Sequence, residues 1–182
     1  MTESETLCNG KWLRLKRSGR WEYAERTNPG GGVMVIALTP QDRLLFVEQY
    51  RPAIGCKAIE MPAGLVGDLA ASAGESAITA AHRELIEETG YRAAHMQFLM
   101  EGPTSAGMSN EIMAFVLASG LQRVGPGGGD ESEEITLHEV PRAQATRWLL
   151  DQLAAGFSID PKIFAGLYML ETAGEFLRKG QR

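Results

Sequence analysis

The chain has 182 residues, 44% of them hydrophobic and 23% charged, which is typical of a single globular domain with a sizeable core. Eighteen Lys and Arg residues stand against 23 Asp and Glu residues, and the resulting net charge of −5 argues against a general nucleic-acid surface. No apolar run is long enough to span a membrane and no signal segment is visible, so we predict a cytoplasmic protein with no membrane partner.

Runs of β-branched and aromatic residues predict strands along most of the chain. These runs are residues 10–26 (two short strands around Ser18-Gly19), 31–38, 44–50, 96–101, 111–118 and 135–140. We expect 31–38 and 44–50 to form a hairpin within a mixed sheet, because Gln41-Asp42 between them is a turn signal. Residues 59–67 contain a proline and a glycine and are expected to form a loop.

Helices are predicted for residues 75–89, 141–155 and 161–178. The first has the clearest end, because it contains no glycine or proline before Gly90, a residue type that commonly terminates helices. Ile78, Ala81 and Leu85 recur at helical spacing and are expected to face the core. Paired strands with helices on both sides predict α/β packing around a mixed sheet.

Three glutamates share one side of the predicted helix 75–89. Glu84, Glu87 and Glu88 are spaced i, i+3 and i+4, so their charges repel unless a cation lies among them. A hard cation such as Mg²⁺ or Mn²⁺ would supply that charge, and Arg83 could orient one of the carboxylates. A solvated acidic helix face is the alternative interpretation of these three residues taken alone.

The helix and the residues around it also match a known motif. The string E-x7-R-E-L-I-E-E-T-G-Y, from Glu75 to Tyr91, is similar to the Nudix box, and every fixed position from Glu75 to Gly90 is filled. The opening glycine of that box is expected at Leu69, six residues before Glu75, whereas Gly64 stands eleven residues before it. The segment between them therefore resembles an insertion of five residues.

The resemblance implies the fold and a metal centre. The implied fold is the Nudix α/β/α sandwich with a mixed sheet, and the implied cofactor is Mg²⁺, for which Mn²⁺ can substitute. Glu75 would bind the metal through water or hold the loop. The implied metal ligands are Glu84, Glu88, Glu87 and the backbone carbonyl of Ala63. Glu87 is also implied as a catalytic or bridging group.

Beyond the box, the chain resembles the branch of ADP-ribose and nucleoside diphosphate sugar pyrophosphatases. The segments that carry this resemblance are Gly10-Lys11-Trp12, Trp21 to Thr27, Val47 to Pro52 and Ile59 to Gly64. The implied substrate-binding residues are Trp12 and Trp21 for the base, Arg26 and Arg51 for the diphosphate, and Met108 and Ser109 beside the terminal sugar. A core or interface role for the tryptophans and a surface salt bridge for each arginine are the alternatives.

In this branch two subunits exchange N-terminal strands. The resemblance therefore implies a homodimer in which residues 1–28 serve dimerisation and base binding, and residues 29–182 form the hydrolase domain. The catalytic base in this branch comes from a loop outside the box. The acidic stretch after Gly127 to Gly129 offers Glu133 first and Glu131 second, unless it is only a solvated loop.

The predicted function is divalent-metal-dependent hydrolysis of the diphosphate of a nucleoside diphosphate sugar, ADP-ribose or a related compound, to a nucleoside monophosphate and a sugar phosphate. One alternative is a hydrolase of other nucleoside diphosphate compounds or polyphosphates. Another is a sugar-nucleotide sensor that binds without cleaving, although no carboxylate of the box is lost here.

Overall fold

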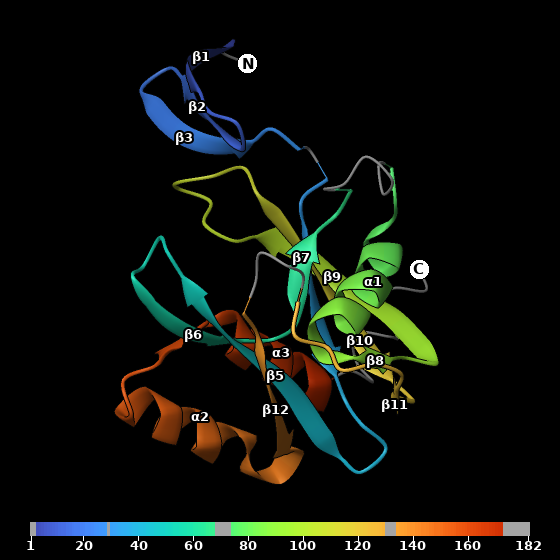
Figure 1. Ribbon diagram of the computed structural model, residues 1–182. Helices are drawn as coiled ribbons and strands as arrows, with labels where there is room; N and C mark the ends of the chain where they lie inside the picture. The colour runs from blue at the N-terminus through green and yellow to red at the C-terminus, as the bar shows by residue number, and fades with distance from the viewer. Residues whose placement is uncertain (1–2, 29, 68–73, 130–133, 173–182) are drawn as a thin grey trace.

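The computed structural model describes residues 3–28, 30–67, 74–129 and 134–172. Figure 1 shows the order and arrangement of the elements within these residues. The strands are β1 (Ser4–Asn9), β2 (Leu13–Ser18), β3 (Trp21–Arg26), β4 (Gly32–Ala37), β5 (Arg43–Arg51), β6 (Cys56–Glu60), β7 (Ala63–Leu65), β8 (Tyr91–Arg92), β9 (His95–Pro103), β10 (Ile112–Ser119), β11 (Gln122–Arg123), β12 (Thr136–Pro141) and β13 (Ser158–Ile159). The helices are α1 (Ala77–Thr89), α2 (Ala145–Ala154), α3 (Lys162–Glu171) and the short 3-10 helix η2 (Arg142–Gln144).

Two mixed sheets form the centre of the molecule. The first has the order β7-β4-β10-β9 with β4 and β10 parallel, and the second has the order β12-β5-β6-β13 with β6 and β13 parallel. The hairpin predicted from 31–38 and 44–50 is present only at its turn, where Leu38 and Leu44 form an isolated antiparallel bridge, and β4 and β5 belong to different sheets. Both edges of β4 are already paired, with β7 and with β10, so β5 pairs in the other sheet.

Helices cover both sides of the two mixed sheets. Side chains alternate across a strand, so Val33 of β4 packs with Leu85 of α1 while its neighbour Met34 packs with Leu149 of α2 and Ile163 of α3. The result is three layers, with α1 over one face and α2 and α3 over the other. The α/β packing predicted from the sequence is confirmed.

The predicted core side of the first helix is also confirmed. Ala81 and Leu85 are fully buried, and Ile78 packs against the same cluster. No helix in the described part of the chain has both the length and the apolar content that crossing a membrane requires.

The segment 59–67 differs from the loop that its proline and glycine predict. Strand β6 continues to Glu60, and β7 follows Pro62 and pairs antiparallel with β4, Ala63 lying opposite Met34. The carbonyl of Pro62 accepts a hydrogen bond of 2.7 Å from the Val35 N–H. This pairing fixes Ala63 and Gly64 beside α1, where the Ala63 N–H reaches the Glu88 carboxylate.

The N-terminal strands form a separate three-stranded antiparallel sheet, in the order β1-β2-β3, at one end of the molecule (Figure 1). The two strands predicted around Ser18-Gly19 are β2 and β3, and β1 is an additional strand. The Ala24 N–H of β3 donates a 2.7 Å hydrogen bond to the Met108 carbonyl, which joins this sheet to the loop between β9 and β10.

Candidate active site

Helix α1 has well-defined ends that place its glutamates. The Ser76 side chain accepts a hydrogen bond from the Thr79 N–H, which caps the first turn. Gly90 has a φ of 72° and donates its N–H to the Ile86 carbonyl, which ends the helix where the sequence predicts. Glu75 therefore lies just before the helix, and Glu84, Glu87 and Glu88 lie in its last two turns.

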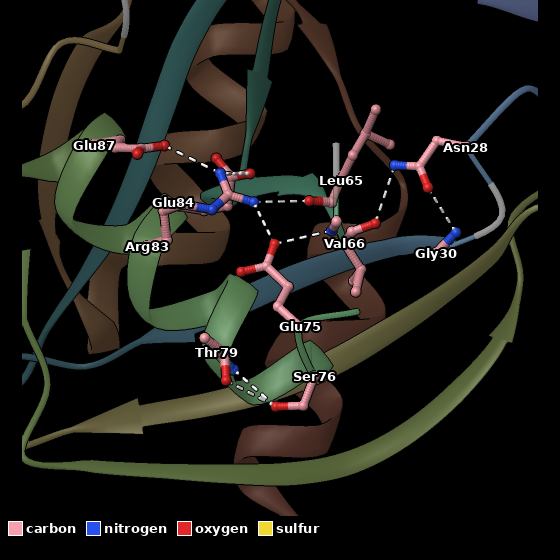
Figure 2. A network of polar contacts seen from close by, with 11 residues as sticks. Asn28, Gly30, Leu65, Val66, Glu75, Ser76, Thr79, Arg83, Glu84 and Glu87 are labelled. Carbon is pink, nitrogen blue, oxygen red and sulfur yellow. Dashed lines mark hydrogen bonds and ion pairs between the residues drawn. The ribbon is translucent and has the colours of Figure 1, made fainter. Parts of the chain in front are cut away.

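Arg83 connects the carboxylates of this region (Figure 2). Its Nη1 lies 2.7 Å from Oε1 of Glu84 and 3.2 Å from Oε2 of Glu87. Its Nη2 lies 2.8 Å from Oε1 of Glu75 and donates to the Leu65 carbonyl at 2.9 Å. The Arg83 side chain is only 19% exposed, so its charge acts on these carboxylates with little solvent between them. Arg83 thus supplies part of the positive charge that the three glutamates require.

Strand β7 also contacts these carboxylates. The Ala63 N–H donates a 3.0 Å hydrogen bond to Oε2 of Glu88. Glu88 is only 2% exposed. A Cβ added to Gly64 would lie 1.9 Å from Oε1 of Glu84, so only glycine lets the backbone come this close. The structure therefore brings together Ala63, Glu84 and Glu88, three of the predicted metal-binding residues. The Glu87 side chain is more exposed, at 45%.

Glu75 holds the chain before α1. Its Oε1 accepts from Arg83 and, at 2.9 Å, from the Gly67 N–H. Burial favours the neutral acid, but the hydrogen bonds from Arg83 and Gly67 and the charge of Arg83 outweigh it, so the pKa of Glu75 is lowered. Of the two roles expected for Glu75, the structure displays the loop-holding one. The predicted insertion falls largely on residues 68–73, which lie outside the described residues.

The carboxylates are arranged around Arg83. Within residues 3–28, 30–67, 74–129 and 134–172, no group of three or more His, Cys, Asp or Glu side chains is placed to hold a metal ion. The donor set nevertheless fits a hard divalent cation, because it consists of carboxylate oxygens beside a backbone segment that Gly64 keeps open to Glu84.

Arg26, Met108 and Ser109 lie in one cluster. Residues 108–110 run beside β3, where Ala24 and Ser109 form a parallel bridge. The Arg26 Nε donates to Glu111, which also accepts from the Thr104 hydroxyl at 3.1 Å. Arg26 and Glu111 also line a cavity with a volume of about 460 Å³, whereas Met108 and Ser109 do not line it. Its charged lining residues are Arg14, Arg26, Glu25, Glu101 and Glu111.

The cavity and the carboxylate site are distinct places. Arg26 lines the cavity, whereas Glu84, Glu87 and Glu88 do not. Arg51 does not line the cavity either, and it pairs with Glu60 at 2.6 Å on the β5–β6 hairpin. Within one chain, the predicted diphosphate-binding arginines therefore have different surroundings.

The two predicted base-binding tryptophans are exposed. Trp12 is 66% exposed and Trp21 is 60% exposed, so neither is a core residue of the single chain. Cations lie over both rings, with Lys11 Nζ 4.4 Å from the Trp12 ring centroid and the Arg20 guanidinium 5.9 Å from that of Trp21. By contrast, Trp148 stacks on buried Phe46.

The predicted catalytic bases, Glu131 and Glu133, lie outside the described residues. The backbone on either side of them is described. The Gly128 N–H donates to the Glu88 carbonyl at 2.9 Å, and the Gly129 N–H donates to the Glu87 carbonyl at 3.0 Å. This part of the chain is thereby held against the C-terminal end of α1.

Sequence reasoning missed Glu60 and Gln49 as partners of Arg51. It also missed Glu111 as the partner of Arg26. These contacts depend on strand register and on contacts between distant segments, which no local motif encodes. The alternation of polar residues at Gln49 and Arg51 is the one signal that places both side chains on the same face of β5.

The NUDIX domain family model matches residues 28–158. The chain is 31% identical to "Methanol dehydrogenase activator" of Bacillus methanolicus, over 82% of each chain. It is 34% identical to "ADP-ribose pyrophosphatase" of Mycobacterium tuberculosis, over 81% of this chain and 72% of that protein. It is 29% identical to "GDP-mannose pyrophosphatase" of Escherichia coli, over 95% and 86%.

A solved structure described as "Crystal structure of ADP compounds hydrolase" superposes with a TM-score of 0.69 at 23% identity, covering 98% of this chain and 93% of that one. This similarity confirms the fold predicted from the box, the α/β/α sandwich with mixed sheets. With the family model matched over most of its length, the chain belongs to the NUDIX family.

Proposed function

We propose that the protein is a metal-dependent pyrophosphohydrolase that cleaves the diphosphate of nucleoside diphosphate sugars into a nucleoside monophosphate and a sugar phosphate. The observation that carries this proposal is the convergence of Glu84 and Glu88 with Ala63 and Gly64 in a chain of the NUDIX family. Two of its relatives are named pyrophosphatases of ADP-ribose and of GDP-mannose, which supports this substrate class.

Hydrolases of this family generally use a divalent metal ion. Glu84, Glu88, Glu87 and the Ala63 carbonyl would hold Mg²⁺, or Mn²⁺ in its place. The bound ion would neutralise diphosphate charge and make phosphorus more electrophilic. Arg83 would then keep Glu75 as a partner and continue to orient the carboxylates from outside the metal site.

The chain's own cations and aromatic rings would bind the rest of the substrate. Arg51 and Arg26 would hold phosphate oxygens, because a guanidinium group matches their geometry. Trp12 and Trp21 would stack on the base, and Met108 and Ser109 would border the terminal sugar. The exposure of both tryptophans supports this role over a role in the core.

A water molecule would attack one phosphorus, with the bond to the bridging oxygen breaking and the proton passing to a carboxylate. Glu133 is the first candidate for this base and Glu131 the second, with Glu87 as a further catalytic group. The hydrogen bonds from Gly128 and Gly129 to the carbonyls of Glu88 and Glu87 support this assignment, because Gly129 shortly precedes Glu131 in the sequence.

We also propose that the protein forms a homodimer through residues 1–28, with exchange of the N-terminal strands. The exposed apolar side chains Leu13 and Leu15 of β2 support this, since burial against a second copy would remove them from water. Light scattering would measure the mass in solution, and a monomer would contradict this part of the proposal. A cytoplasmic location stays a prediction.

The decisive experiment is a Mg²⁺-dependent assay of ADP-ribose, GDP-mannose, UDP-glucose, ATP and dinucleotides, with products identified by mass spectrometry. We expect the sugar nucleotides to be cleaved within the diphosphate. The variant Glu88→Gln should lose turnover by about a thousandfold while remaining folded, because a charge at the reacting centre is removed. Tight ADP-ribose binding without hydrolysis by the wild type would instead identify a sensor.

A further inference from the structure

The β5–β6 hairpin carries a polar cluster on the side that faces α1. The two strands pair antiparallel with Val47 opposite Glu60, so Glu60 shares a face with the side chains of Gln49 and Arg51. Leu45 lies on the same face of β5 as Gln49 and Arg51, and it packs in the hydrophobic cluster that contains Leu85 of α1. Glu60 therefore faces the layer that carries the box glutamates.

One carboxylate oxygen gathers the donors of this cluster. Oε2 of Glu60 lies 2.6 Å from Nη2 of Arg51 and accepts from its Nε at 2.9 Å. The same oxygen accepts from Nε2 of Gln49 at 3.1 Å. The Glu60 side chain is 15% exposed while that of Arg51 is 40% exposed, so the anchor is sheltered and the arginine extends toward solvent.

This arrangement restricts Arg51 without using all its hydrogen-bonding capacity. A guanidinium group has five N–H donors in a rigid plane, and Glu60 takes donors from one edge of that plane only. A long arginine side chain loses substantial rotamer entropy when it is immobilised on binding. An arginine that a carboxylate already holds has lost much of that entropy before the ligand binds, so binding costs less free energy. The remaining donors therefore keep a fixed direction.

The backbone links this cluster to the carboxylate site. Glu60 stands three residues before Ala63, whose N–H binds Glu88. The Ala63 end of this segment is fixed by pairing of β7 with β4, and the Glu60 end by pairing of β6 with β5. The direction of Arg51 is thus tied to the position of α1 through a short, hydrogen-bonded stretch of chain.

We propose that Glu60 is a positioning residue that holds Arg51, with Gln49 as a brace, in the orientation that receives the substrate diphosphate. This inference rests on the proposed function, in which Arg51 binds the diphosphate. Glu60 acts through Arg51 and does not touch the substrate. Its removal should therefore weaken substrate binding without removing the catalytic groups on α1.

The test compares two glutamates on opposite faces of the same strand pair. Glu60→Gln should raise KM for ADP-ribose about tenfold, the loss expected for one charge-assisted hydrogen bond, with a smaller change in kcat. Glu48 is the matched control, because it is similarly buried and accepts from Lys57 at 2.7 Å and from His138 at 3.0 Å on the side of α2. Glu48→Gln should leave KM unchanged.

A double-mutant cycle with Arg51→Ala shows whether Glu60 acts through the arginine. In that background Glu60→Gln should have no further effect on KM. In the protein that retains Arg51, Glu60→Asp keeps the negative charge and should therefore recover part of the affinity that Glu60→Gln loses. Equal effects of Glu60→Gln and Glu48→Gln, or additive effects of Glu60→Gln and Arg51→Ala, would overturn the proposal.

Failure of the proposed function gives a different result. If the wild type cleaves no compound of the panel, the hydrolase assignment fails, and the dissociation constant of ADP-ribose measured by calorimetry replaces KM in the same cycle. Hydrolysis by the wild type with an unaltered KM in Glu60→Gln contradicts only the positioning role. Circular dichroism and thermal melting of each variant identify any loss of fold.

Discussion

The carboxylate site at α1 and the N-terminal sheet β1–β3 differ in how far one chain completes them. At α1, Glu88 is 2% exposed, and Arg83 binds three carboxylates and a backbone carbonyl. In the N-terminal sheet, Trp12 is 66% and Trp21 60% exposed. One region is built from contacts within the chain, and the other presents large apolar side chains outward.

Under the proposed function, this difference separates chemistry from recognition. A metal centre requires fixed oxygen donors, and buried hydrogen bonds provide such fixation. Binding of a planar base requires an open ring, which a core tryptophan cannot offer. Exposed leucines beside the tryptophans further suit burial against a second copy. Variants in the two regions should therefore alter different kinetic parameters.

The largest effect is expected at Gly64. In Gly64→Ala the new Cβ would meet the Glu84 carboxylate at 1.9 Å, and that carboxylate, at the end of a flexible side chain, must move. We expect Mn²⁺ affinity and kcat/KM to fall about a hundredfold, as for loss of a group that orients metal ligands. Calorimetry with Mn²⁺ and steady-state kinetics would measure both.

Gly125→Ala is the matched control, because a Cβ there meets no atom within 4 Å among the described residues. It should behave as the wild type in both measurements. Full activity of Gly64→Ala would mean that Glu84 is not required at its present position. Fixed geometry at α1 would then not be a requirement of the reaction.

The sequence predicts the α1 region better than the sheets. The end of α1 could be read locally from Gly90, although the helix begins at Ala77 after its Ser76 cap and not at Glu75 as predicted. The hairpin at Asp42 was predicted from equally local signals, yet only one bridge of it forms, because β4 pairs along both edges with β7 and β10. Pairing between distant strands is a property of the whole chain.

The candidate site shows the same division. The motif identifies Glu84, Glu87 and Glu88 because they lie on one helix, and the structure adds that Ala63 meets Glu88. The contact of Glu60 with Arg51 and the fit of Gly64 against Glu84 arise from strand register and backbone approach. Neither has a local signature, and both govern where the functional groups point.

An intermediate effect is expected in the N-terminal sheet. Trp12→Ala and Trp21→Ala should each raise KM about tenfold with little change in kcat, because stacking on a base contributes about 1–3 kcal/mol to binding. Tyr168→Ala removes a similarly exposed aromatic ring, at 63%, from α3 and should leave KM unchanged. If both tryptophan variants keep the wild-type KM, the base binds elsewhere. Light scattering on the same variants separates loss of stacking from loss of a dimer.

The smallest effect concerns stability and pH at Glu75. Its pKa is lowered in the folded protein from the ordinary value of 4.5, against the effect of burial, by hydrogen bonds from Arg83 and Gly67 and by the charge of Arg83. A carboxylate whose folded pKa lies below its unfolded pKa stabilises the fold above the unfolded value. That contribution is lost as the pH falls from 4.5 through the folded pKa.

Glu75→Gln should therefore reduce the free energy of unfolding near neutral pH by about 1 kcal/mol, the difference between a hydrogen bond to a charged group and one to a neutral group. The difference from the wild type should shrink below pH 4.5, where the wild-type carboxylate takes up a proton. Urea unfolding across this pH range measures it, and Glu22→Gln on exposed β3 provides the control. A difference that stays constant with pH would show that Glu75 acts through packing alone, and the charged network around Arg83 would then contribute to ligand geometry but not to the fold.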